Sequence, residues 1–531
     1  MVELMIGRTL CWTLAWVVML PNPFWACGAE PVSAGEAMTP AKSQWVSLTA
    51  QGELAYKTLP AGDRIMDFSY AGYGGGGVAL PDVPVKAVVA ASGGDDTTSI
   101  QEALNTVARA EMVNGFRGAV LLRAGTFTCS RPLTLNASGV VLRGSGSGTN
   151  GTTIRMTGAP HVCLTVSDPT GAEHLGEPVR ITAAYVPSGT RWLEVEDASG
   201  FRPGDSVLVT RPVTAAWLQF MNMDGLVRNG RRETWLGEGS RIFMERRVET
   251  VAGHRVGLDL PLSDALDAKY LEPPGATLQK LTPPQRLSQV GLEHLRIVCP
   301  PQPVAISQRH HQAIRMDGVM DGWVRDLAIE DTVNSVSVGS GARRITLENV
   351  RVQHTVATKG SAKPADFSAG GTQILLDRCS VAGDNLFYFV TGPRVTGPNV
   401  VLHCTFQGNG HLQPHARWAT GLLVDNCEVL DGGIDFMNRG EMGSGHGWTM
   451  GWGVAWNCAA RSYVIQQPPG AANWAIGCRG GRQTSGMPFG HEPKLPEGIF
   501  DSHNTPVAPA SLYLAQLRAR LGGAALQAIG Y

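Results

Sequence analysis

The side chains best able to do chemistry gather in two stretches, GNGHLQPHARWATG from residue 408 and GIDFMNRGEMGSGHGWTMGWG from residue 433. Together they contain three histidines, two arginines, two asparagines and three tryptophans. Imidazole rings move protons, guanidinium groups bind carboxylates in bidentate geometry, and aromatic faces stack on sugar rings. Such a mixture is unusual for a packed wall. It predicts a site for a saccharide that carries carboxylate groups.

Proton abstraction next to a carboxylate needs a base and a set of cations. His415 is the first candidate base, with His446 and Tyr388 behind it. The candidate catalytic residues are His415, Arg417, Arg439, Asn438 and His446. The candidate substrate-binding residues are Asp384, Asn385, Tyr388, His411, Trp418, Asp435 and Trp448.

Three functions fit these residues. A lyase acting on a uronic-acid polysaccharide must neutralise the carboxylate, remove the proton on C5 and release the sugar on O4. A glycoside hydrolase instead needs two carboxylates at a set separation. The region offers Asp384, Asp431 and Asp435 singly, so the missing pair favours the lyase. A protein that only binds carbohydrate would spread its polar residues along the whole fold, whereas here they concentrate.

No metal site is evident in the sequence. No cysteine pair has CxxC spacing, and acidic clusters that would bind calcium are sparse, although Ca²⁺ in place of the cationic side chains remains an open alternative. His310 and His311 form a second-tier candidate pair near Arg315 and Asp317. A zinc site there would need a third ligand, and a turn explains the two histidines equally well.

The elements that must position these residues repeat from Gly291 onward. The segments GLEHLRI, WVRDLAI, ITLENVRV, LLDRCSV, VLHCTF, LLVDNCEV, VAWNCAA and AIGCRG align with one another. Their central residues are Leu295, Leu327, Val350, Cys379, Cys404, Cys427, Cys458 and Cys478. Asn or Asp often precedes the central residue, a glycine-rich turn follows it, and no unit contains an amphipathic helix. This pattern predicts a solenoid of stacked β-strand coils, with each central residue pointing inward. The cysteines then form an interior ladder of small apolar side chains.

The N-terminal part predicts a cap. DDTTSIQEALNTV has apolar residues at helical spacing, and Thr98 and Gln101 match a capping box. Together with Asp67-Phe68 before it and Ala124-Gly125-Thr126-Phe127 after it, this segment resembles the opening of the pectate-lyase superfamily, including its rhamnogalacturonase-type and epimerase-like members. Arg123 stands where the family usually has proline. The resemblance implies an all-β fold: a single-stranded right-handed parallel β-helix with an N-terminal capping helix and an inserted small β subdomain.

One further likeness concerns the site. GSGHGWTMG is similar to the Gly-His-Gly segment of polygalacturonases, and His446 is the matching residue. The other acidic segments of that family have no evident counterpart here. The resemblance therefore implies a carbohydrate-active protein without choosing its reaction.

The chain divides into six expected segments. They are a signal peptide (1–29), a linker (30–60), an N-terminal cap with the first coils (61–170), an inserted β-rich subdomain (171–285), the coils that carry the site (286–485), and a C-terminal tail and cap (486–531).

Composition and the N-terminal segment predict where the protein acts and on what kind of partner. The 531 residues are 43% hydrophobic and only 17% charged, with a net charge of −1, which argues against disorder and against nucleic acid as a partner. Arg8, the apolar run from Leu10 to Leu20 and the small residues after Cys27 are typical of an export signal. We expect a secreted or periplasmic monomer, with no membrane association after signal cleavage, acting on an acidic polysaccharide.

Overall fold

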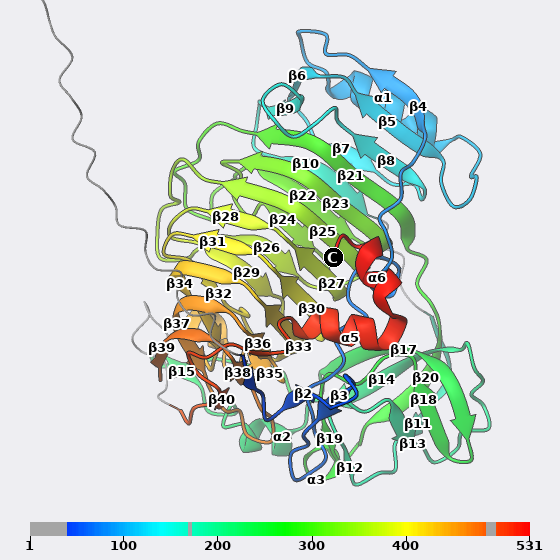
Figure 1. The fold of residues 1–531 in the computed structure, drawn as a ribbon, viewed down its shortest axis with the longest axis vertical. Helices are drawn as coiled ribbons and strands as arrows, with labels where there is room; N and C mark the ends of the chain where they lie inside the picture. The colour runs from blue at the N-terminus through cyan, green and yellow to red at the C-terminus, as the bar shows by residue number, and fades with distance from the viewer. Residues whose placement is uncertain (1–39, 168–172, 485–494) are drawn as a thin grey trace, which may run out of the picture. The chain divides into compact units, whose positions relative to one another are not determined.

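A computed structural model describes residues 40–167, 173–484 and 495–531. The expected signal peptide lies outside them. The described chain is a right-handed parallel β-helix, which confirms the predicted fold class (Figure 1). No helix among these residues is long and apolar enough to cross a membrane.

Each coil contributes to three runs of parallel strands, here named sheets A, B and C. Sheet A contains β4 (Val85–Val89), β5 (Gly118–Leu122), β8 (Val140–Arg143), the first halves of β21 (Leu287–Val298), β23 (Val319–Glu330) and β25 (Arg343–Gln353), then β27 (Thr372–Asp377), β30 (Thr396–Leu402), β33 (Ala419–Asp425), β35 (Met450–Gly451), β36 (Val454–Trp456), β38 (Trp474–Ile476) and β40 (Ile499–Asp501). Sheet B contains β6 (Gly125–Cys129), β9 (Thr152–Met156), the second halves of β21, β23 and β25, then β28 (Ser380–Ala382), β31 (Thr405–Gln407) and the starts of β34 (Glu428–Phe436), β37 (Ala459–Ile465) and β39 (Arg479–Gln483). Sheet C contains β7 (Leu133–Leu135), β10 (Val162–Ser167), β22 (Gln312–Asp317), β24 (Val336–Val338), β26 (Ala365–Ala369), β29 (Phe387–Thr391), β32 (His411–Leu412) and the ends of β34, β37 and β39.

The corner between sheets A and B explains the repeat. The residue before each central position has a positive φ, for example 51° at Asn349, 51° at Asn426 and 50° at Asn457. Asn and Asp tolerate this left-handed conformation better than other non-glycine residues, which accounts for their recurrence there. The central residues then pair in register from Leu295 to Cys478.

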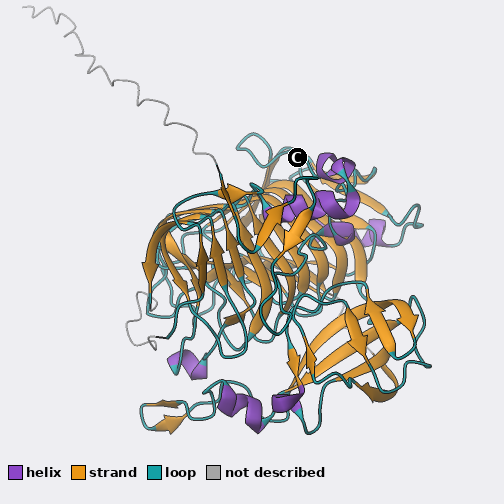
Figure 2. Ribbon diagram, turned by 60° about the horizontal axis from the view of Figure 1, so that its bottom comes forward, coloured by secondary structure: helices purple, strands orange, loops and turns teal. Residues whose placement is uncertain are grey.

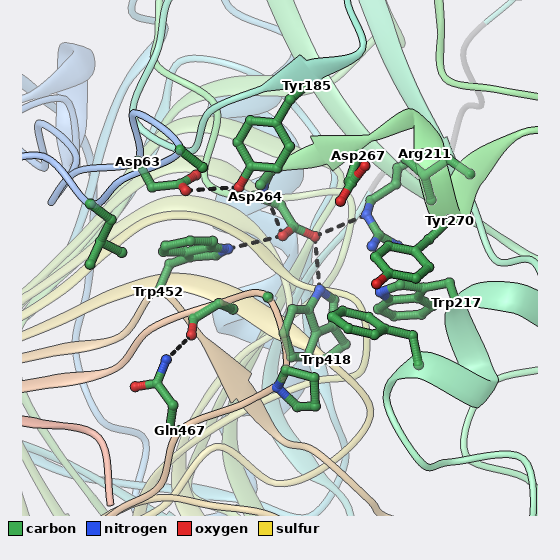
Figure 3. Close-up of a pocket in the computed structure, with 18 of the residues that line it drawn as sticks. Asp63, Tyr185, Arg211, Trp217, Asp264, Asp267, Tyr270, Trp418, Trp452 and Gln467 are labelled. Carbon is green, nitrogen blue, oxygen red and sulfur yellow. Dashed lines mark hydrogen bonds and ion pairs between the residues drawn. The ribbon is translucent and has the colours of Figure 1, made fainter.

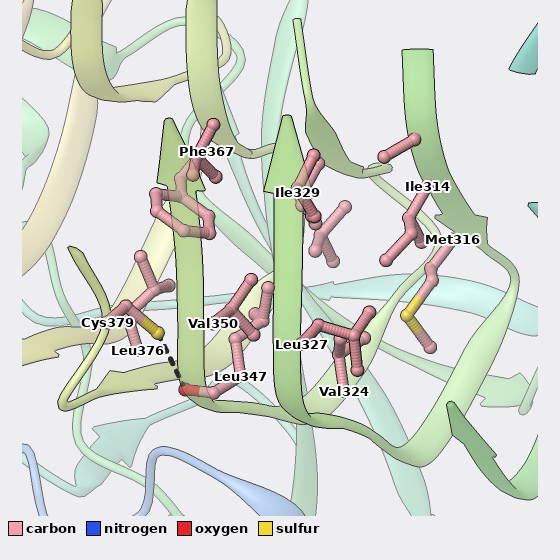
Figure 4. Close-up of a cluster of buried hydrophobic side chains, with 14 of the residues drawn as sticks. Ile314, Met316, Val324, Leu327, Ile329, Leu347, Val350, Phe367, Leu376 and Cys379 are labelled. Atoms are coloured by element: carbon pink, nitrogen blue, oxygen red, sulfur yellow. Dashed lines mark hydrogen bonds between the residues drawn. The ribbon is translucent and has the colours of Figure 1, made fainter. Parts of the chain in front are cut away.

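The inward side chains form one continuous apolar core, part of which Figure 4 shows around Leu327, Val350 and Cys379. The predicted cysteine ladder is confirmed, because all eight cysteines of the described residues are buried free thiols. The Cys427 thiol, for example, donates to the carbonyl of Val401 in the preceding coil (3.4 Å). The ladder is therefore held by stacking without disulfides.

This ladder predicts a stability effect. Cys404 and Cys458 lie one strand spacing on either side of Cys427, so a larger side chain there has no free space. We expect Cys427→Leu to lower the free energy of unfolding by about 1–3 kcal/mol. Urea unfolding measures this, with exposed Leu430→Ala as the control. Equal stability of Cys427→Leu and the wild type would contradict the packing described.

The capping helix forms as predicted, but the hydrogen bonds at its N-terminus differ from the predicted capping box. Helix α1 (Thr97–Ala108) buries Ile100, Leu104 and Val107. Asp96 is the N-cap residue, and the predicted capping box is wrong, because Gln101 instead accepts a hydrogen bond from the Thr134 backbone N–H (2.8 Å). Gln101 therefore ties the helix to sheet C.

Residues 40–60 are ordered, unlike the expected linker. Strand β1 (Ala41–Lys42) pairs with β41 (Val507–Ala508), and β2 (Val46–Leu48) forms a hairpin with β3 (Leu54–Tyr56). The cause is burial of Trp45, whose ring packs edge-on against Trp474. A 3-10 turn, η1 (Tyr73–Gly75), follows before β4.

The insertion between β10 and β21 is a separate β-rich layer, which Figure 2 shows as antiparallel strands beside the coils. Its main sheet has the order β11-β20-β14-β17-β18-β13. The bounds of its strands are β11 (Glu173–Arg180), β12 (Tyr185–Val186), β13 (Trp192–Glu194), β14 (Ser206–Pro212), β15 (Val227–Arg228), β16 (Arg231–Arg232), β17 (Arg241–Ala252), β18 (Arg255–Leu258), β19 (Leu266–Asp267) and β20 (Thr277–Thr282). Its helices are α2 (Ala215–Phe220) and α3 (Ala268–Leu271).

The C-terminal helices, α5 (Leu512–Leu521) and α6 (Gly523–Ala528), lie along the side of the coils (Figure 1). Ser511 donates to Asp425 of β33 (2.7 Å), and the Tyr531 hydroxyl donates to Asp377 of β27 (2.5 Å). These buried carboxylates fix the tail at the middle of the β-helix. The expected cap over the last coil is therefore not what this segment forms.

Candidate functional site

The outer side of sheet C positions the candidate residues. His411, Gln413 and His415 alternate along an extended segment, with the backbone N–H of Gln413 and of His415 bonded to the preceding coil. His411 pairs with Gly433 of β34, so Gln413 and Asp435 lie side by side on neighbouring coils. Alternate residues of a strand share one face, so this segment presents two histidines and a glutamine together.

His411 and Asp435 form a buried pair. The distance from His411 Nδ1 to Asp435 Oδ2 is 2.7 Å, and Gln413 Nε2 donates to the same oxygen (2.7 Å). A carboxylate accepts, so Nδ1 carries the proton and Nε2 of the neutral ring holds a lone pair. Burial alone would lower the pKa of His411, but the charge and hydrogen bond of Asp435 outweigh burial and the opposing charge of Lys363, so this pKa is raised. The pair has the arrangement of a general base with its orienting group.

His415 and Arg439 form a second pair, one coil apart. Nη1 of Arg439 lies 3.2 Å from His415 Nδ1 and donates to the His415 carbonyl (2.9 Å). Because arginine is only a donor, Nδ1 of His415 must accept, and the proton of the neutral ring sits on Nε2. Nε2 of His415 is thus a hydrogen-bond donor. Nδ1 of His415, the expected base, is therefore occupied, whereas Nε2 of a neutral His411 ring holds its lone pair.

A loop on the next coil completes the cluster. The ring centroids of His415 and His446 are 4.7 Å apart. Arg417 donates from Nη2 to the Ser444 carbonyl and hydroxyl, at 2.7 Å each. Helix α4 (Met442–Gly445) forms this loop, and Arg228 of the insertion donates to the Gly443 carbonyl (2.5 Å). The inserted layer therefore braces the loop that carries His446.

The cluster is cationic although its two histidines are neutral. Burial, then the charge of Arg439, lowers the pKa of His415 to about 4. Burial, then Arg439, His415 and two further arginines, lowers the pKa of His446 to about 3. Near neutral pH the charge of this cluster thus comes from its guanidinium groups. Such an arrangement favours a bound carboxylate.

Two buried acceptors lie between the pairs. Gln413 and Asp435 are both 0% exposed. Within the described residues no donor reaches Gln413 Oε1 or Asp435 Oδ1. Buried polar atoms normally have partners, so these two oxygens are exceptions within the site.

Several expected site residues have structural roles. The Asn438 side chain accepts from the Gly440 N–H (2.7 Å) within its own turn. Asp384 and Asn385 bond Asn409 of the next coil (2.9 and 2.8 Å), which builds a turn between stacked coils. Tyr388 is 0% exposed and stacks on Phe406, and burial raises its pKa to about 12, which makes it unsuited to act as a base.

The two expected sugar-stacking tryptophans lie in the interior. Trp418 and Trp448 are each 2% exposed. Nε1 of Trp448 donates to the Met221 carbonyl of the insertion (3.2 Å), and Trp418 contacts Trp217 and Trp235 edge-on. The prediction that Trp448 stacks on a sugar is therefore wrong, because its buried ring joins the insertion to the coils.

The second-tier histidines are placed elsewhere. His311 is 5% exposed and contacts His161 edge-on, with a ring separation of 5.0 Å. His310 faces the Gln308 carbonyl (2.8 Å) at a turn. No group of three or more potential metal ligands occurs in residues 40–167, 173–484 or 495–531.

Three residues that contact or influence the site were not predicted from the sequence. Gln413 orients Asp435, Lys363 lies close enough to influence His411, and Phe387 packs edge-on against His415 (5.5 Å) and lies 5.7 Å from the Arg439 guanidinium. The alternation of Gln413 between two histidines was a usable signal. Lys363 and Phe387 come from earlier coils, and no sequence spacing links them to the site.

No model of a known protein family matches the chain, and no curated protein does. Similar solved structures include the tailspike protein gp49 from Pseudomonas phage LKA1, with 12% identity, a TM-score of 0.38, and coverage of 77% of this chain and 74% of that one. Polygalacturonase from Erwinia carotovora ssp. carotovora has 12% identity, a TM-score of 0.27, and coverage of 77% and 95%. The catalytic unit of a GH87 α-1,3-glucanase from Streptomyces thermodiastaticus has 12% identity, a TM-score of 0.25, and coverage of 85% and 71%. The class that the coordinates define is a parallel β-helix protein with a His-Asp and His-Arg cluster on its outer face.

Proposed function

We propose that this protein is a carbohydrate-active enzyme, and specifically a lyase that cleaves a uronic-acid polysaccharide by β-elimination. The observation that carries the proposal is the His411–Asp435 pair, which lies on the same extended segment as His415 and its cluster, whose arginines are charged and whose histidines are neutral. A base next to carboxylate-binding cations is what this reaction needs. A hydrolase needs two carboxylates, whereas in the described residues Asp435 is the one carboxylate that contacts His411, His415 or His446, which agrees less well with a hydrolase.

Each residue of the site has its own role in the proposed reaction. Arg439 and Arg417 bind the uronate carboxylate, which spreads the negative charge that develops when C5 loses its proton. Nε2 of His411 takes that proton, the C5–H electron pair forms the C4=C5 double bond, and the C4–O4 bond breaks. The leaving oxygen then takes up a proton from the His411 imidazolium or from water. His415 donates from Nε2 to the substrate and holds it in place.

A screen of acidic polysaccharides tests the proposal. The purified protein is incubated with pectate, alginate and glycosaminoglycans while ultraviolet absorbance follows the conjugated unsaturated uronate. We expect absorbance to rise on one polymer, and to rise much more slowly with Asp435→Asn protein at the same concentration. Flat absorbance on every uronate polymer, or equal rates for the two proteins, would contradict the proposal.

The pKa of His411 predicts the pH dependence. The base must be neutral, so kcat/KM is expected to fall as pH falls through a pKa above the ordinary histidine value of about 6.5. Asp435→Asn removes the charge that raises this pKa and leaves burial and Lys363, which lower it. The acid limb of the residual activity should therefore move to lower pH. A limb at the wild-type position would rule out His411 as the titrating group.

A further inference from the structure

A pocket of about 390 Å³ lies apart from the histidine cluster, where three distant parts of the chain meet (Figure 3). The coils supply Trp418, Trp452 and the loop 467–471. The insertion supplies Arg211 and residues between 217 and 271, and residues 59–63 close one side. The function proposed above uses none of these side chains.

The floor of the pocket is a fixed carboxylate. Asp264 is 2% exposed and accepts from the indole N–H groups of Trp418 (2.8 Å) and Trp452 (3.0 Å). Asp63 lies nearby and accepts from the Tyr185 hydroxyl (2.8 Å). With the half-buried Asp267, these residues give the pocket three carboxylates (Figure 3).

Arg211 is the charged partner in this pocket, and it has unused donor capacity. It is 4% exposed, stacks on Trp217 at 3.9 Å, and approaches Asp264 with Nε at 3.3 Å. That contact lacks hydrogen-bond geometry, and within the described residues Nη1 also has no hydrogen-bond partner. A buried guanidinium with an unpaired donor is costly unless a ligand supplies an acceptor.

The chemistry of the lining selects among ligands. Three aspartates against one arginine repel an anionic group, whereas a simple cation offers Arg211 no acceptor. Hydroxyl groups both donate and accept, so one such group can donate to a carboxylate and accept from Nη1. Aromatic faces at the rim, including the stacked pair Phe220 and Tyr270 (3.9 Å), suit the apolar face of a sugar ring.

We propose that this pocket binds a neutral sugar unit. Arg417 of the histidine cluster and Trp418 of the pocket are consecutive residues, both with positive φ (59° and 60°). Their Cα atoms are about 3.8 Å apart, so the histidine cluster and the pocket adjoin the same turn of the chain. We therefore infer that the substrate is a heteropolysaccharide in which neutral units accompany uronates. The uronate part of this inference rests on the proposed function.

Ligand-observed NMR titrations test the pocket. The probes are glucose, galactose, mannose, rhamnose, fucose and xylose, with glucuronate and galacturonate as charged counterparts, applied to the full chain. At least one neutral sugar should bind saturably. Tyr270→Ala and Asp267→Asn, whose asparagine can still cap α3, should each raise its Kd about tenfold. Trp192→Ala, an exposed aromatic residue elsewhere in the insertion, should leave it unchanged.

Three results would overturn the inference: no saturable binding of any neutral sugar, unchanged Kd in both pocket variants, or equal loss in Trp192→Ala. Neutral-sugar binding should persist in His411→Asn protein. Loss of polymer cleavage with intact neutral-sugar binding would thus count against the lyase alone, and the reverse result would count against the pocket alone.

Discussion

His411→Asn is expected to lower kcat by about 10²–10⁴-fold, because the substitution removes the ring nitrogen that takes the C5 proton. Asparagine retains a polar side chain that can still donate to Asp435, so the buried carboxylate keeps a partner. KM should change much less than kcat, because substrate carboxylate binding rests on Arg439 and Arg417. Initial rates of unsaturated product formation give both constants.

His294→Asn is the matched control. His294 also contacts an aspartate through Nδ1, 3.0 Å from Asp326 Oδ2, but lies at a distant corner with a φ of 57° that asparagine tolerates. Its activity should stay within about twofold of wild type, as for most surface changes. Full activity of His411→Asn, or an equal loss in His294→Asn, would remove His411 from the mechanism.

Arg439→Ala should lower kcat/KM by about 10²-fold or more, the loss expected when one charge-stabilising donor leaves a reacting carboxylate. The change also removes the hydrogen bond to His415 Nδ1 and a positive charge that lowers the pKa of His415. Kinetics on the polymer identified by the screen measure the loss, and thermal unfolding checks that the variant folds.

Arg394→Ala controls for the loss of a nearby positive charge. Arg394 is exposed, and its backbone N–H donates to the Arg417 carbonyl of the next coil (2.9 Å). It therefore lies in the turn stacked on that of Arg417, and among the described residues its side chain makes no hydrogen bond with the histidines of the site. We expect its kcat/KM to stay within about twofold of wild type. If Arg439→Ala behaves like Arg394→Ala, the uronate carboxylate binds elsewhere.

The coils were predictable because one position per coil obeys simple rules. An apolar or cysteine residue follows a left-handed corner residue, and this pair recurs wherever the chain turns between sheets A and B. The helix that caps the first coil was predictable from Ile100, Leu104 and Val107. In both cases local conformation and burial act on residues close in sequence.

The details of the site were less accessible, because they depend on the lengths of individual coils. The regions of His415, Arg417, Arg439 and His446 could be aligned from the cysteine positions. The pairing of His411 with Asp435, and the hydrogen bond that occupies His415 Nδ1, follow only from strand register. The Asp264 pocket joins segments far apart in sequence, and no pattern within one segment indicates it.

The ratio of unsaturated ends to new reducing ends tests the central claim most directly. Both are measured in one reaction of the wild-type protein with the polymer that it cleaves. β-Elimination predicts one unsaturated uronate for every new reducing end, with both signals lost together in His411→Asn. Reducing ends without unsaturated product would show hydrolysis and contradict the lyase assignment.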